Sequence, residues 1–429
     1  TMHGISVKSH TGGLFDWEAA ASTYRYAQDI SRRNGATNFL PAAQSGGAGT
    51  VADGSGTGWT ALALKGIWRP NADHTADFGV QSDRYVLGTI TSNIAGNWML
   101  DAPGALANAV GGVTSTSSVY AQDAWSMAPL WKTVLGVRVE NWSAKDGATT
   151  FGVRNANNQQ YDSRGESWVS PKAALSYQVL ADTVVKASVG RAVRFPTANE
   201  LYGATSTTNS QYINDPNLKP EKSWTTELSA EKDLGHAVWR LTYFAEDTQD
   251  SLYSQTTFDT TANRNVSRVQ NVDRMQTQGL EVAFNGENVL EGWLARGLDL
   301  SGSVTYTDST IKENAGFVVV AGDTLGKRQP NIPAWRATAL ASYRWSPQLS
   351  TSLGLRYSGP QFRTLNNADV NGFTYQGVSE FFVADLRVRY QFSKQLTAAV
   401  GIDNLNNQQY WNFHPYPQRS FTAEIKWDL

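Results

Sequence analysis

The chain of 429 residues contains no cysteine. Disulfides, thiolate metal sites and cysteine nucleophiles are therefore excluded. It also lacks a run of about 18 apolar residues, so no transmembrane helix is expected. The formal net charge is −2, and no basic stripe or tail occurs, which argues against nucleic acid as a partner. The N-terminus has no basic, apolar and small-residue segments in the order of a signal peptide.

Catalytic motifs are absent as well. The five histidines are scattered, and no HExxH, GxSxG or P-loop spacing occurs. The glycine-rich stretch 46–58 is not followed by a strand-to-helix unit, so it is interpreted as a loop rather than a phosphate cradle. We therefore expect no enzymatic activity and no bound cofactor or metal.

What the sequence has in abundance is period-two alternation. In its last ten residues, Phe421, Ala423, Ile425, Trp427 and Leu429 alternate with Thr422, Glu424, Lys426 and Asp428. The pattern recurs in about 17 segments of roughly 10–14 residues, whereas no long stretch has the helical period. A tilted membrane strand needs about 9–11 residues to cross the hydrocarbon. The alternation predicts strands with one face towards lipid and one towards a watery lumen.

The connections between these segments alternate in length. Short turns are expected at Thr11–Phe15, Arg69–Asp73, Ala128–Leu130, Val179–Asp182, Leu234–Gly235, Ser346–Gln348 and Ser393–Gln395. Long polar loops are expected at about 28–57, 88–116, 143–165, 194–222, 252–274, 309–333, 360–379 and 404–419. This rhythm is typical of outer-membrane barrels, which have short periplasmic turns and long extracellular loops. A soluble sandwich is the alternative.

Aromatic residues favour the barrel over the sandwich. They occur repeatedly beside the short turns, as an aromatic girdle at one membrane interface requires. The predicted members of this girdle are Trp68, Trp125, Trp131, Tyr177, Trp239, Tyr343, Trp345, Phe392 and Trp427. We therefore predict an all-β fold, a transmembrane antiparallel β-barrel with about 17 strands present. The first and last strands run in the same direction, so the count is odd, and five more strands would give an even total of about 22.

Four stretches carry a family resemblance: GRAVRFPTANELYG (190–203), NDPNLKPEKSWTTELSAE (214–231), GIDNLNNQQYW (401–411) and PYPQRSFTAEIKW (415–427). They resemble the C-terminal barrel of TonB-dependent outer-membrane receptors of the ferric-siderophore type. The resemblance covers 1–429 as one barrel portion. It implies an N-terminal plug and the first strands before residue 1. Glu200 and Glu221 are expected to hold basic neighbours at the rim, and Asn404, Asn406 and Asn407 to form sharp turns.

The resemblance also implies a function. Such a receptor in the bacterial outer membrane binds a ferric siderophore at its extracellular loops and imports it with energy from the TonB–ExbB–ExbD complex. Outer-membrane lipid and lipopolysaccharide would surround it. A passive channel is the alternative, as is another cargo: cobalamin, a copper chelate, haem or an oligosaccharide. Haem receptors of this family carry a histidine in the interval that corresponds to 196–217, as an axial ligand to the iron. Haem is disfavoured here because no histidine occurs between Pro196 and Asn217.

Aromatic and basic loop residues are the candidates for contact with an anionic chelate. Flat rings and fixed positive charge together suit such a ligand, because it loses water on entering the loops. The alternative role of the aromatics in the last loop is an outer-leaflet girdle, and Arg194 is assigned to loop packing. The predicted ligand-binding residues are Trp98, Arg363, Tyr410, Trp411, His414, Tyr416 and Arg419, with Phe413 in the same loop.

Overall fold

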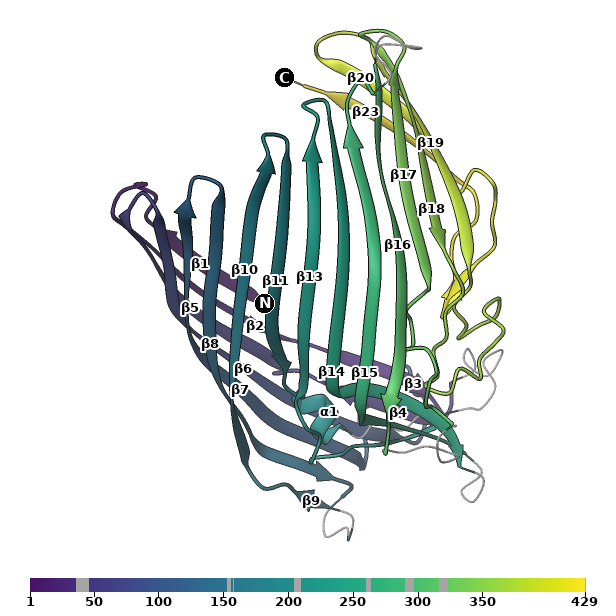
Figure 1. Ribbon diagram of the computed structural model, residues 1–429. Helices are drawn as coiled ribbons and strands as arrows, with labels where there is room; N and C mark the ends of the chain where they lie inside the picture. The colour runs from purple at the N-terminus through teal and green to yellow at the C-terminus, as the bar shows by residue number, and fades with distance from the viewer. Residues whose placement is uncertain are drawn as a thin grey trace.

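The computed structural model describes residues 1–35, 46–152, 156, 158–203, 210–259, 264–289, 297–315 and 323–428. They form one curved main sheet of 21 strands (Figure 1). Of these, 17 pair in chain order, each antiparallel to the next, and are called the wall strands. The wall strands are β1 (Met2–Lys8), β2 (Phe15–Arg25), β5 (Gly58–Asn71), β6 (His74–Ile94), β7 (Leu106–Ala128), β8 (Trp131–Thr150), β10 (Arg164–Leu180), β11 (Thr183–Arg194), β13 (Glu221–Asp233), β14 (Ala237–Asp259), β15 (Arg264–Gly286), β16 (Leu298–Glu313), β17 (Trp335–Arg344), β18 (Leu349–Ser358), β19 (Phe381–Gln391), β20 (Leu396–Asp403) and β23 (Ser420–Trp427).

The remaining elements lie at the long-loop end of the wall. β4 joins β3 to β6, β9 pairs with β8, and β12 runs parallel to β15, while β21 and β22 form a separate hairpin. One helix, α1, is present among the described residues. The bounds of these elements are β3 (Ile30–Asn34), β4 (Gly49–Asp53), β9 (Gln159–Gln160), α1 (Ala198–Tyr202), β12 (Ser210–Ile213), β21 (Trp411–Asn412) and β22 (His414–Pro415).

The alternation in sequence gives the wall two chemically distinct faces. On β8, Val137 and Val139 lie on one face, called here the outer face, and are 43% and 41% exposed. Arg138 and Glu140 lie on the opposite, inner face and form an ion pair of 3.0 Å. The concave side of the sheet carries α1 (Figure 1). The inner face therefore corresponds to the predicted lumen and the outer face to the predicted lipid surface.

Close packing fixes α1 against the inner face. The Tyr202 ring is only 1% exposed and packs with Trp142, Ala144 and Leu201. Glycines on β7 and β8 make this contact possible, because a Cβ on Gly112 or Gly147 would lie 2.4 Å from the ring of Tyr202.

The last strand has the predicted orientation. Phe421, Ile425 and Trp427 share the outer face and are 74%, 78% and 63% exposed. Glu424 lies on the inner face, where it forms an ion pair with Arg387 of β19. The face of β23 opposite its apolar residues therefore carries charge, as the sequence predicts.

All seven predicted short turns are confirmed, since each joins two consecutive wall strands. The predicted girdle is also present beside them. Its six tryptophans are between 37% and 64% exposed, and the Trp131 ring stacks on Tyr177 with centroids 4.1 Å apart. This edge of the wall is called the short-turn girdle.

The predicted strand lengths are wrong for the middle of the wall. β7, β14 and β15 each extend over 23 residues, and β6 over 21. Much of the predicted loops 88–116, 143–165 and 252–274 is therefore strand. The reason is that Gly, Ser and Thr residues continue the ladder beyond the apolar band wherever the neighbouring strand offers backbone partners.

The wall forms an open trough (Figure 1). Within the described ranges no pairing joins β1 to β23, so both strands have one free edge. The all-β antiparallel architecture with 17 wall strands agrees with the predicted fold class.

Candidate functional site

The last loop folds into a hairpin over the end of the C-terminal wall strands. β21 and β22 pair through Trp411 with Pro415, and Phe413 at the turn has a φ of 66°. Trp411 donates its backbone N–H to Ser379 Oγ at 2.9 Å, and its carbonyl accepts from the Ser379 N–H at 3.0 Å. The hairpin is therefore attached to the preceding long loop by reciprocal hydrogen bonds.

An aromatic stack supports this hairpin. The Tyr410 ring lies 4.7 Å from Tyr416 in a stacked arrangement and 4.6 Å from Phe381 at the start of β19. Tyr410 is 7% exposed, and this burial raises the pKa of its phenol. Tyr416 remains 45% exposed. The stack thus presents an accessible ring on a buried base.

A pocket of about 380 Å³ lies between the hairpin and the inner face of β17–β19. Arg336 and Arg356 line it, and both come from inner-face positions of their strands. Arg356 is bound to Asp385 at 3.0 Å, whereas Arg336 forms no ion pair with any residue that the structure describes. The other residues that line the pocket include Ser358, Gln361, Val378, Ser379, Phe381, Tyr410, Trp411, Asn412 and Tyr416.

This pocket combines flat apolar surface with surplus positive charge. Two guanidinium groups and one carboxylate leave it electropositive, which suits an anion with planar rings. It is called the arginine–tyrosine pocket below. Sequence reasoning missed Arg336 and Arg356, because each sits within a strand pattern as one more polar inner-face residue.

Arg363 lies beside a second hollow of about 780 Å³, lined among others by Tyr253, Asn331 and Tyr375. Its guanidinium lies 4.6 Å from the centroid of the Phe413 ring and donates to the carbonyl of Gln376 at 2.6 Å. The loop that carries Arg363 is thereby held against the last hairpin.

The other predicted ligand residues are placed differently. His414 is exposed and meets Phe413 edge-to-face at 4.7 Å. Arg419 donates to the carbonyl of Leu405 at 2.6 Å, so its guanidinium is engaged within its own loop. Trp98 lies near β3 and β4, where its carbonyl accepts from Arg32 at 3.0 Å. Neither Trp98 nor Arg419 lines the arginine–tyrosine pocket.

The rim motif 190–203 is architectural in this structure. Arg194 pairs with Glu200 at 2.6 Å, and Thr197 and Glu200 form a capping box at the start of α1. Arg194 therefore packs as predicted. Glu221 differs from its prediction, since it accepts hydrogen bonds from Ser251 Oγ and the Leu252 N–H rather than holding a basic partner among the described residues.

Asparagines shape the approach to the last loop as predicted. Asn404 and Asn407 have φ values of 54° and 53°, a region that asparagine tolerates better than most residues. Asn406 donates its amide to the carbonyl of Phe382 at 2.7 Å. These contacts fix the direction in which the chain leaves β20.

No group of three or more His, Asp or Glu side chains within the described ranges has the geometry to hold a metal ion. In the same part of the chain, no helix has the length and apolarity needed to cross a membrane.

Residues 3–405 match the family described as "TonB dependent receptor-like, beta-barrel". The chain belongs to this family. Members are outer-membrane proteins, so the chain is an outer-membrane β-barrel wall, and its outer face is the lipid-facing one.

The curated relatives share only a low sequence identity with the chain. The chain is 23% identical over 306 residues to the probable TonB-dependent siderophore receptor PiuA of Acinetobacter baumannii, covering 69% of this chain and 37% of that protein. It is 24% identical over 267 residues to the ferric enterobactin receptor of Pseudomonas aeruginosa, covering 57% and 34%. The chain thus spans little more than a third of the length of these relatives.

A solved structure of similar fold is the copper transporter OprC. The match covers 99% of this chain and 65% of the OprC chain, with a TM-score of 0.75 and 15% sequence identity. Similarity at this level of identity establishes the fold of the TonB-dependent receptor barrel and leaves the cargo to be argued from the residues of this chain.

Proposed function

We propose that the chain forms the wall of a receptor that imports a ferric siderophore across the outer membrane. In this proposal, 1–429 acts as one barrel domain of the whole protein and has no enzymatic role. The energy comes from the TonB–ExbB–ExbD complex, and lipopolysaccharide and phospholipid surround the barrel. The arginine–tyrosine pocket is the observation that carries the proposal.

The chemistry of the pocket favours an anionic ring-bearing chelate over neutral cargo. A ferric siderophore loses water on entering the loops, and Arg336 supplies a positive charge that has no acid partner among the described residues. Tyr416 and Trp411 supply aromatic faces on which planar groups can stack. A neutral oligosaccharide would use the rings and leave the arginines without a partner. The names of the two curated relatives, a siderophore receptor and a ferric enterobactin receptor, point the same way.

The predicted residues fall into three groups under this proposal. Tyr410, Trp411 and Tyr416 serve the arginine–tyrosine pocket, and Arg363 with His414 serves its flank. Trp98 and Arg419 are proposed as contacts made only when the loops close on the ligand.

The pocket arginines provide the direct test. In the full-length receptor, the double variant R336Q/R356Q should bind its ferric siderophore about 10- to 100-fold more weakly. One charge-assisted hydrogen bond contributes about 1.5–3 kcal/mol, and Arg356 is already held by Asp385, so the loss is counted as one such bond. Binding is measured by isothermal titration with a panel of siderophores, alongside cobalamin and a copper chelate. The matched control is R389Q, an exposed inner-face arginine of β19 close to a short turn. Equal binding by both variants would contradict the proposed site.

Transport requires a separate experiment. Uptake of radioactive iron as the ferric siderophore should require TonB and should fall in R336Q/R356Q but not in R389Q. A passive channel would instead show uptake without TonB and steady ion conductance in planar bilayers. Growth on cobalamin or copper chelates alone, with no siderophore bound, would assign the pocket to another cargo.

A further inference from the structure

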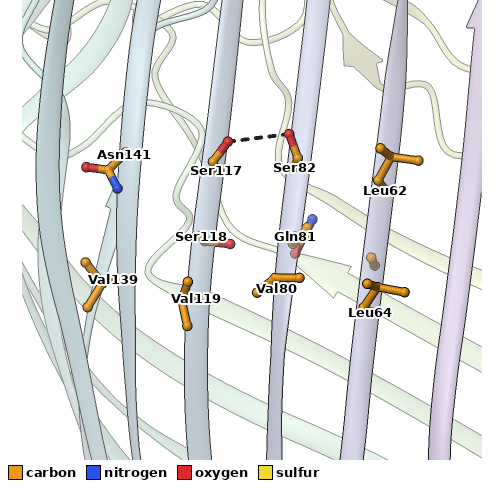
Figure 2. Close-up of a pocket in the computed structure, with 11 residues that line it drawn as sticks. Leu62, Leu64, Val80, Gln81, Ser82, Ser117, Ser118, Val119, Val139 and Asn141 are labelled. Atoms are coloured by element: carbon orange, nitrogen blue, oxygen red, sulfur yellow. Dashed lines mark hydrogen bonds between the residues drawn. The ribbon is translucent and has the colours of Figure 1, made fainter.

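The outer face of β5–β8 is hollowed by a groove of about 430 Å³. Figure 2 shows its apolar side chains beside a row of short polar ones. Ser82 and Ser117 share a hydrogen bond of 3.4 Å across two strands, and their small size leaves space between Leu62 and Asn141. The apolar lining on the outer face, with exposures between 41% and 60%, consists of Leu62, Leu64, Val80, Val119 and Val139.

The polar row runs across neighbouring strands and lies at the long-loop end of the groove. Ser117 lies opposite Asn141, and Asn141 lies opposite Ser167 of β10, which donates to its side-chain oxygen at 2.6 Å. The groove thus begins at hydroxyl and amide groups and runs along apolar residues towards the short-turn girdle.

Three cations lie beyond the polar row on the same face. The pairing register places Arg25 of β2 and Lys145 of β8 in one row across the sheet, joined by Gly58, Val86 and Val113. Arg84 of β6 lies one row nearer the groove. All three side chains are exposed. None of them forms an ion pair with another residue in the part of the chain that the structure describes, and Lys145 is not paired with its neighbour Asp146.

We propose that this groove and these cations bind a phosphorylated, multi-acyl lipid of the extracellular leaflet, the lipid A part of lipopolysaccharide. One acyl chain lies in the groove, and Arg25, Arg84 and Lys145 hold the headgroup phosphates. Ser82, Ser117 and Asn141 face the polar linkage between chain and headgroup.

Charge complementarity identifies the occupant. Cations at the edge of a hydrocarbon band are costly unless an anion neutralises them, and an anionic lipid headgroup is the anion available at that depth. Arg25 and Lys145 stand four strand spacings apart, about 19 Å. That separation is too wide for a single phosphate, so a headgroup with two phosphates fits better than a phospholipid.

The test compares lipid retention by full-length receptor variants. Receptor purified in detergent is incubated with bisphosphorylated lipid A, and retained lipid is counted by native mass spectrometry. R84S/K145S should retain at least fivefold less, while the control R389S/K394S, which loses the same charge at the short-turn end, should retain the normal amount. Dephosphorylated lipid A should bind weakly and equally to the two double variants.

Further arms separate the alternatives. S117L fills the groove without changing charge, and it too should lower retention; normal retention would overturn the acyl-chain part of the proposal. Equal losses in both double variants would indicate attraction by net charge alone and overturn the site. Full competition by phosphatidylglycerol would overturn the two-phosphate headgroup. Heat-resistant migration of the folded barrel in gels confirms that each variant is compared in its native form.

Discussion

Two regions of the wall end their apolar outer faces in different ways. Ser117 on β7 and Trp335 on β17 lie at the same distance along the strand from the short-turn girdle. Ser117 has the same sequence separation from the girdle residue Trp125 as Trp335 has from Tyr343. The N-terminal region thus ends in Ser82, Ser117, Asn141 and Ser167, whereas the C-terminal region ends in rings. These rings form a second girdle on the outer face, and they are Tyr243, Tyr306, Trp335, Tyr357, Phe382 and Phe421.

The difference separates anchoring from recognition. Rings at an interface place an apolar body in the hydrocarbon and a polar edge among headgroups, so they fix the depth of the wall. A row of serines makes no such anchor but leaves room for a ligand, and the cations beyond it supply charge. The same position in one continuous sheet therefore serves two purposes, depending on side-chain size.

The shared apolar band gives the largest predicted effect. Val304 lies on the outer face of β16 opposite Val282, and is 46% exposed. V304R should lower the free energy of unfolding from phospholipid vesicles by about 2–4 kcal/mol, because it places a charge within the apolar band between the two girdles. Urea titration followed by tryptophan fluorescence measures the change. The control T305R moves the same charge to the inner face beside Glu281 and should lose under about 1 kcal/mol.

The last-loop hairpin extends the comparison to the inner face. Trp411 lines the arginine–tyrosine pocket, on the opposite face from the second girdle. W411A should weaken siderophore binding by about 1–3 kcal/mol, as for a buried anchor, and leave the unfolding free energy nearly unchanged. Both quantities are measured on the same full-length variant. Normal affinity with reduced stability would assign Trp411 to a purely structural role.

The second girdle predicts the reverse outcome. The rings of Trp335 and Tyr306 lie 4.8 Å apart, and both side chains are more than 40% exposed on the outer face. W335A should lower the unfolding free energy by about 1–2 kcal/mol, since an aromatic pair and its interfacial contact are lost together. Siderophore affinity should stay normal. W335F, which keeps the ring, should recover most of the stability, and an equal loss in both variants would contradict an anchoring role for the ring.

Most of the fold could be predicted because its cause is local. Alternation at Phe421–Leu429 is decided by which medium each face meets, and turn residues such as Gly235, with a φ of 83°, are readable one by one. Strand length could not be predicted in the same way. Whether 106–118 is strand or loop depends on β6 and β8 lying alongside, which no local pattern reveals.

The candidate site was only half predictable for a related reason. Tyr410 and Tyr416 stand out as aromatics clustered in one loop. Arg336 and Arg356 become a pair only when β17 and β18 are in register and a hairpin from far along the chain lies above them. Trp98 shows the limit of residue type as a signal, since a conspicuous residue in a long loop does not by itself line the same pocket.

The smallest predicted effect tests whether the two regions can be interconverted. Asn141 is exposed on the outer face between Ser117 and Ser167. N141W should raise the unfolding free energy in vesicles by about 0.5 kcal/mol, within the range of cross-strand aromatic contacts, because it supplies the missing girdle ring. The same ring fills the end of the groove, so lipid A retention should fall. S143W, one row farther from the hydrocarbon, should produce neither change. A loss of stability in N141W would mean that the wall itself depends on the hydrogen bond between Asn141 and Ser167, and the polar row would then belong to the fold rather than to a lipid.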